Sequence, residues 1–211
     1  MRLSFLFAFL FIYFSAFPWE PKDYLSFFPE EIAKKAADTE KADNYSSIER
    51  EVFLLTNLAR MAPKEFSELL TAYVAKSRFY QSNNSYVLSL KRDLLKAKPI
   101  EQPLENHNIL KDLAVSHAKY GITTGKYGHQ NAPQRAKTVN NKMNHNMYAE
   151  NCAYHDTNAL DAVMGLLIDE GIKDLGHRKT ILNPKLTHMG IAMLPMKKPK
   201  EFILVQSFSA K

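Results

Sequence analysis

Residues 157–184 read TNALDAVMGLLIDEGIKDLGHRKTILNP, and this stretch says most about how the chain folds. Its first half places apolar side chains on one helical face, which predicts a helix ended by Gly171, a residue suited to a left-handed helix cap. Asp169 and Glu170 are expected in the last turn, where acidic side chains oppose the helix dipole. The cationic side chains of GHRK, residues 176–179, lie only a short loop away and can offset this unfavourable interaction. The simplest interpretation is a solvated helix end with a weak surface ion pair between these acids and cations.

Helices are predicted before this stretch and strands after it. Ser46 and Glu49 have the spacing of a capping box that begins an amphipathic helix, and Pro63 begins the next helix. The predicted helices cover residues 46–62, 63–76 and 108–120, and the predicted strands are HMGIAML (188–194) and EFILVQSFS (201–209), joined by a turn. This order predicts an α/β domain in which helices pack on the faces of a sheet.

The composition is that of an ordinary folded domain. The chain has 211 residues, of which 45% are hydrophobic and 24% are charged, and its formal net charge is +6. The basic residues are scattered, so nucleic acid is not an expected partner. Cys152 is the single cysteine, which excludes an intrachain disulfide and any zinc site built from several thiolates. We expect this thiol to behave as a small buried apolar residue.

The N-terminal sequence predicts export. In residues 1–17, MRLSFLFAFLFIYFSAF, a positive charge precedes an apolar run, which is the order found in a secretory signal peptide. The run is shorter than the ~20 residues that span a bilayer. The alternative to a cleaved signal peptide is an uncleaved anchor, which would be the only expected contact with a membrane. Residues 18–45 form a lead-in segment, and residues 46–211 form the domain. The protein is therefore expected to be secreted or extracytoplasmic.

The sequence lacks the common catalytic motifs GxSxG, HExxH and CxxC and has no phosphate-binding glycine loop. Two histidines follow glycines, His129 in YGHQNAPQR and His177 in DLGHRKTILNP, and Glu150 lies in the otherwise apolar segment MYAENCA. Two imidazoles with one or two carboxylates suit either a divalent-metal site or an acid/base pair. His117 lies beside apolar positions of a predicted helix, so we interpret it as a hydrogen-bonded core or boundary residue.

Several short motifs occur together in a characteristic order: NLAR (57–60), YGH (127–129), AEN (149–151), DLGHRKTILNP (174–184), MGIAM (189–193) and VQSFS (205–209). In this order they resemble the CAP superfamily of cysteine-rich secretory, antigen-five and pathogenesis-related-one proteins, and in particular its bacterial single-domain (SCP-type) branch. The resemblance implies a three-layer α-β-α sandwich over residues 46–211. It also implies a cleft that contains two histidines and two acidic side chains.

By motif, the four cleft residues are His129, Glu150, His177 and Asp169. The larger eukaryotic members have glutamate at the second acidic position, and Asp169 is one methylene shorter, so Glu170 is the alternative there. The resemblance implies that His129 and His177 hold zinc or another divalent cation, bound weakly because two histidines and a distant acid make a small ligand set.

Two functions follow as expectations. The first is an exported binding module for a lipid-like, apolar or cell-surface ligand, which the missing nucleophile motif favours. The alternative is a metal-dependent hydrolase in which Glu150 takes a proton from bound water and Asp169 orients a histidine.

Overall fold

The computed structural model describes residues 23–37 and 44–211. The signal segment predicted for residues 1–17 lies outside the described residues, as do parts of the lead-in segment. Within the described ranges, no helix is both long enough and apolar enough to span a lipid bilayer.

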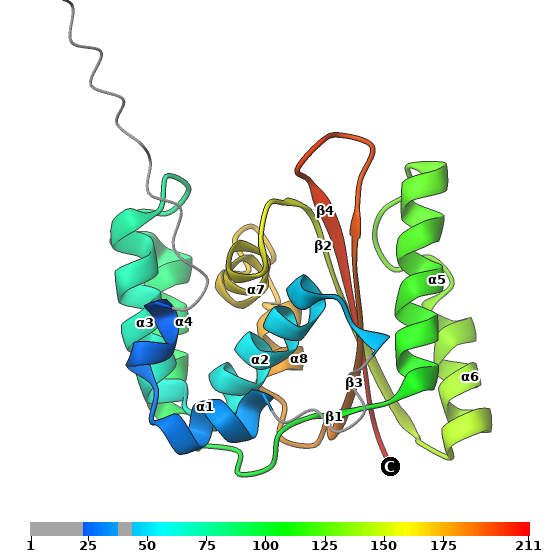
Figure 1. Ribbon diagram of the computed structural model, residues 1–211, viewed down its shortest axis with the longest axis horizontal. Coiled ribbons are helices and arrows are strands. Elements are labelled where there is room, and N and C mark those ends of the chain that lie inside the picture. The colour runs from blue at the N-terminus through cyan, green and yellow to red at the C-terminus, as the bar shows by residue number, and fades with distance from the viewer. Residues whose placement is uncertain (1–22, 38–43) are drawn as a thin grey trace, which may run out of the picture.

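A four-stranded sheet forms the middle layer of the molecule (Figure 1). Its strands are β1 (Glu105–Asn106), β2 (Met147–Asp156), β3 (His188–Pro195) and β4 (Phe202–Ala210), in the spatial order β1-β3-β4-β2. β3 and β4 form the predicted antiparallel hairpin, β2 is antiparallel to β4, and β1 is parallel to β3. β2 therefore forms one edge of the sheet, and this edge strand carries Glu150.

One face of the sheet is covered by α5 (Asn108–Thr124) and α6 (Ala132–Met143) (Figure 1). Side chains alternate between the two faces along a strand, so Ala192 of β3 and Val205 of β4 point toward this face and join a cluster with Ala114 of α5. Gly190 allows α5 to lie very close to β3, because an added Cβ would stand 2.1 Å from the backbone nitrogen of Lys111.

The other face packs against a larger helical layer (Figure 1). This layer contains α1 (Glu30–Ala37), α2 (Ser47–Met61), α3 (Pro63–Lys76), α4 (Ser85–Lys96), α7 (Ala159–Ile168) and α8 (Gly176–Ile181). Its core includes Val52 of α2, Val163 of α7, and Met189 and Ile191 of β3, all buried. Helices thus lie on both sides of the sheet, which confirms the predicted three-layer α-β-α sandwich.

The lead-in segment packs onto the domain where it is described. A short 3-10 helix, η1 (Asp23–Phe27), precedes α1. Tyr24, Phe28 and Ala36 are buried in the larger core, and the Asn57 side chain of α2 donates a hydrogen bond to the Ala36 carbonyl oxygen over 3.1 Å. Residues 23–37 are therefore part of the packed structure.

The helix predictions are confirmed at α2, where Ser46 and Glu49 form the expected capping box, and at α3, which begins at Pro63. The predicted end of the helix before Gly171 is wrong. α7 ends at Ile168, and Asp169 already has left-handed backbone geometry with φ of 58°. α6 and β2 have no counterpart among the predicted elements.

Candidate functional site

Glu150 lies at the centre of the site, and its side chain is only 3% exposed. Arg135 of α6 donates to both carboxylate oxygens over 2.7 and 2.8 Å, and the Tyr148 hydroxyl donates over 2.8 Å. Burial alone would raise the pKa of Glu150, but hydrogen bonds from His129, Arg135 and Tyr148 and the charge of Arg135 lower it to about 2. Glu150 is therefore ionised and has its hydrogen-bonding capacity largely filled.

His129 lies in the loop between α5 and α6 and faces this carboxylate. Its Nδ1 is 2.9 Å from Oε1 of Glu150, and its side chain is half exposed. The loop is fixed at Gly128, whose φ of 104° favours glycine and whose carbonyl oxygen lies 2.7 Å from Nε2 of His117. The backbone before His129 is thus tied to α5.

Asp169 and His177 form a second pair on the other helical layer. Oδ1 of Asp169 is 2.7 Å from Nδ1 of His177, and Oδ2 accepts the backbone N–H groups of His177 and Arg178 over 3.0 and 3.2 Å. Asp169 therefore lies at the N-terminal end of α8, where the helix dipole favours a carboxylate, rather than inside the last turn of α7. Its side chain is 1% exposed.

Glu170, the alternative acid from the sequence, lies elsewhere. Its Oε1 accepts a hydrogen bond of 2.7 Å from the exposed Asn84 side chain. The structure therefore places Asp169 beside His177, and it places Glu170 at the surface. The backbone of His177 is also tied to β2, because its carbonyl oxygen accepts a bond from Asn151 over 3.3 Å.

The two histidine–carboxylate pairs meet at the edge of the sheet. The imidazole centres of His129 and His177 are 6.4 Å apart, and each ring turns Nδ1 toward its own carboxylate. If each Nδ1 carries the proton, each Nε2 keeps a lone pair. A zinc ion lies about 2.0–2.1 Å from a coordinating nitrogen, so two imidazoles that share an ion have centres roughly 5–6 Å apart. The observed separation is slightly above this range.

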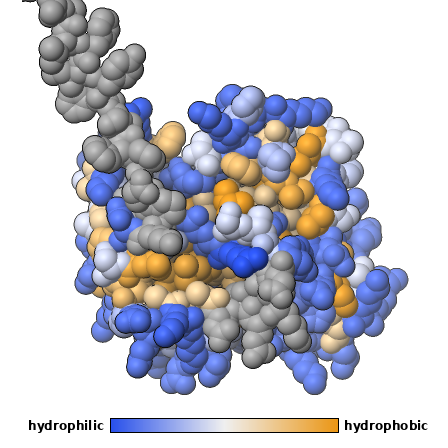
Figure 2. All heavy atoms as spheres, in the orientation of Figure 1, coloured by the Kyte–Doolittle hydropathy of each residue, from blue (hydrophilic) through white to orange (hydrophobic). Residues whose placement is uncertain are grey.

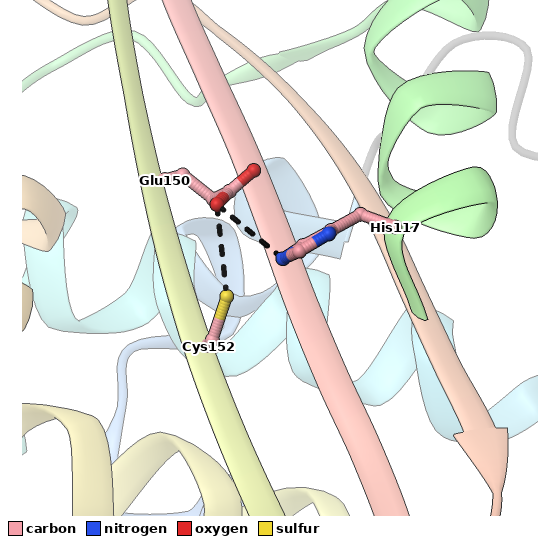
Figure 3. Close-up of side chains that lie close together, drawn as sticks. All are labelled: His117, Glu150 and Cys152. Carbon is pink, nitrogen blue, oxygen red and sulfur yellow. Dashed lines mark hydrogen bonds and ion pairs between the residues drawn. The ribbon is translucent and has the colours of Figure 1, made fainter. Parts of the chain in front are cut away.

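His117 and Cys152 also approach Glu150, which sequence reasoning did not anticipate (Figure 3). His117, Glu150 and Cys152 each offer one potential ligand atom, and these atoms lie within 4.8 Å of one another, a spacing that could hold a metal ion. Each already has partners: Nε2 of His117 bonds the Gly128 carbonyl, and Arg135 neutralises Glu150. Burial, followed by the charge of Glu150, raises the pKa of the Cys152 thiol to about 12. This trio is therefore poorly prepared for an ion, which would have to displace a proton and existing hydrogen bonds.

A pocket of about 230 Å³ opens beside these residues, between α5 and α6. Its walls include His117 and Arg135, which also contact Glu150, together with the side chains of Ser116, Gln134 and Thr138. The helix α6, absent from the sequence-based prediction, thus supplies both a pocket wall and the arginine that holds Glu150. Pro133 in the first turn of α6 is the signal that could have revealed this helix.

Comparisons with known proteins identify the family of this chain. An outer surface protein of Borrelia burgdorferi matches with a TM-score of 0.44 and 15% identity, over 69% of this chain and 92% of that one. A cysteine-rich secretory protein of Staphylococcus aureus matches with a TM-score of 0.40 and 18% identity, over 68% of this chain and 48% of that one. The search of curated proteins gave no match. The model of the cysteine-rich secretory protein family, CAP, matches residues 55–208, and the chain belongs to this family.

Proposed function

We propose that this protein is an exported binding module whose cleft holds a divalent metal ion of the zinc type between His129 and His177. The observation that supports the proposal best is the pair of imidazoles with centres 6.4 Å apart, each with Nδ1 bound to a buried carboxylate. Carboxylates in this position fix the orientation of metal-binding histidines and raise the basicity of Nε2. Export rests on the sequence of residues 1–17.

A binding role has more support than hydrolysis. In the hydrolase alternative, Glu150 would take a proton from water, yet Arg135, Tyr148 and His129 already occupy its oxygens. A carboxylate with a pKa of about 2 is also a weak base at neutral pH. An ion held by two histidines keeps open positions, which oxygen atoms of an external ligand can fill.

The neighbouring pocket suits a ligand with both polar and apolar groups. Most of its lining residues have hydrogen-bonding side chains, including Gln130, Asn131, Gln134 and Arg135, but the surface that they expose to the pocket is mainly apolar. Such walls can bind hydroxyl or amide groups together with the apolar parts of one ligand. We therefore propose a cell-surface ligand of mixed polarity, with a lipid-like ligand as the alternative.

The test is a zinc titration by calorimetry of the full chain at pH 7.5. We expect His129→Ala/His177→Ala to lose one zinc ion per chain while its circular dichroism spectrum stays unchanged. The matched control is His155→Asn, which removes another histidine paired with an acid, Glu201, while asparagine tolerates the local φ of 68°. The proposal fails if the double variant binds as much zinc, and as tightly, as the unaltered chain.

A further inference from the structure

Three of the seven histidines gather at one end of the sheet, and none of them belongs to the cleft. The register explains the grouping: Ser209 near the end of β4 pairs with His188 on one side and with Tyr148 of β2 on the other. His188 begins β3, while His145 lies just before β2. The ring centres of His145 and His188 are 4.8 Å apart, and those of His107 and His188 are 6.0 Å apart. Figure 1 shows this end of the sheet at the C-terminus of the chain.

Two of these imidazoles have the hydrogen bonds that prepare a metal ligand. Nδ1 of His145 lies 2.9 Å from the Ser209 hydroxyl oxygen, and Nδ1 of His188 lies 2.8 Å from that of Thr187. Each hydroxyl can accept a bond from Nδ1–H, which leaves the lone pair on Nε2.

A carboxylate lies close enough to His188 to become a third ligand after its side chain rotates. Oε2 of Glu105 lies 3.5 Å from Nε2 of His188, and two ligand atoms of a tetrahedral zinc site are separated by about 3.3 Å. The Glu105 side chain is 75% exposed, so it can rotate toward an ion without disturbing the core. The spacing of the His145 and His188 rings is slightly below the roughly 5–6 Å expected for two imidazoles that share an ion, and a small rotation of either ring adjusts it.

From this geometry we propose a second divalent-metal site of the zinc type, separate from the cleft, formed by His145, His188 and Glu105. His107 is not assigned as a ligand, because its Nδ1 accepts the Ile109 backbone N–H over 3.2 Å, which fixes the tautomer that carries the proton on Nε2. It contacts His188 edge to face instead. Two nitrogens and a carboxylate oxygen form a ligand set that zinc accepts, with a fourth position open to water.

The experiment uses the full chain with His129→Ala and His177→Ala already introduced, so that the cleft does not contribute. Calorimetric titration with zinc chloride at pH 7.5 should still show one ion bound per chain. Adding His145→Ala and His188→Ala should weaken this remaining binding by at least about tenfold, as expected for the removal of direct ligands. This background separates the two proposals. The proposal for His129 and His177 is tested by comparing the unaltered chain with the His129→Ala/His177→Ala variant, whereas the second site is tested by further changes within that variant.

Glu105→Gln supplies a variant whose exposed side chain poses little risk to folding, and Glu101→Gln, at an exposed glutamate in the segment just before β1, is its matched control. In the same background, Glu105→Gln should lower zinc affinity several-fold, and Glu101→Gln should leave it unchanged. The proposal is overturned if the background chain binds no zinc, or if the affinity is the same with and without His145 and His188. It is also overturned, as a three-ligand site, if Glu105→Gln has no more effect than Glu101→Gln.

Discussion

At the scale of single residues, Glu150 is the most constrained side chain of the site. Glu150→Gln should destabilise the chain by about 3 kcal/mol at pH 7, because it leaves the buried Arg135 guanidinium without its counter-charge. The folded-state pKa of about 2 lies below the ordinary value of 4.5, so ionisation of Glu150 stabilises the fold above pH 4.5 and this contribution is lost as the pH falls toward 2. Urea unfolding should show that the difference in free energy of unfolding between the variant and the unaltered chain is smaller at pH 3 than at pH 7. Equal stability at pH 7 would contradict this account.

Cys152 distinguishes between two metal ligand sets that share the same neighbourhood. If His129 and His177 bind zinc, Cys152→Ala should leave zinc affinity within about twofold and cost about 1 kcal/mol of stability through lost packing. If the ion instead bound His117, Glu150 and Cys152, removal of the thiolate would lower the affinity by at least about tenfold. Calorimetric zinc titration of the Cys152→Ala variant decides between the two ligand sets, and His117→Asn is tested in the same way.

The residues of the site differ in how far sequence could identify them. The motifs YGH, AEN and GHR direct attention to His129, Glu150 and His177 because each residue stands beside a distinctive neighbour. Arg135 and Tyr148 lack such a signal, since they reach Glu150 only through the packing of α6 and the alternation of side chains along β2. Contacts between separate elements are set by tertiary structure, which local patterns do not encode.

At the scale of elements, Asp169 joins the end of α7 to the start of α8. Asp169→Asn should change the free energy of unfolding by no more than about 1 kcal/mol, because asparagine tolerates the left-handed backbone and keeps an acceptor for the α8 amides. Zinc affinity should fall by about tenfold, because His177 loses its charged partner. Glu170→Gln is the matched control and should change neither property. An equal loss of affinity in both variants would remove Asp169 from this role.

The close packing of α5 on β3 depends on Gly190. Gly190→Ala should destabilise the chain by about 3 kcal/mol or more, because the new methyl group would overlap the backbone of α5 at Lys111 and Leu110. Gly165→Ala is the contrasting variant: its Cβ would meet nothing closer than 3.9 Å, and alanine is favoured in the helix α7. It should stabilise by up to about 1 kcal/mol. Thermal unfolding measures both, and a similar effect of the two variants would contradict the packing argument.

The elements show why helix ends are harder to predict than helix faces. The apolar face of α7 is clear in the sequence, but Gly171 suggests a later end than the true one at Ile168. The chain turns left-handed at Asp169 because its carboxylate is held by the α8 amides, a tertiary interaction. β2 escapes prediction because Glu150 and Asn151 interrupt its apolar pattern, and both are polar residues of the site.

At the scale of the whole molecule, the two histidine–carboxylate pairs belong to different layers. His129 and Glu150 are held by α5, α6 and β2, whereas His177 and Asp169 are held by the junction of α7 and α8 on the other side of the sheet. An ion shared by the two histidines would therefore link the outer layers across β2. An ion that binds the folded chain but not the unfolded chain stabilises the fold by about 2.7 kcal/mol when the free ion concentration is a hundred times Kd.

This arrangement predicts a distinctive pattern of hydrogen exchange. Saturating zinc should slow exchange in two separate segments together, the loop around residues 126–131 and the junction at residues 169–178, because one ion restrains both. The second site, formed by His145, His188 and Glu105, should slow exchange around residues 143–147 and 187–189 independently. In the His129→Ala/His177→Ala variant, zinc should no longer slow exchange at residues 126–131 and 169–178, but it should still slow exchange at residues 143–147 and 187–189. Protection of only one cleft segment would show that the histidines do not share an ion, since a bridging ion must restrain both layers at once.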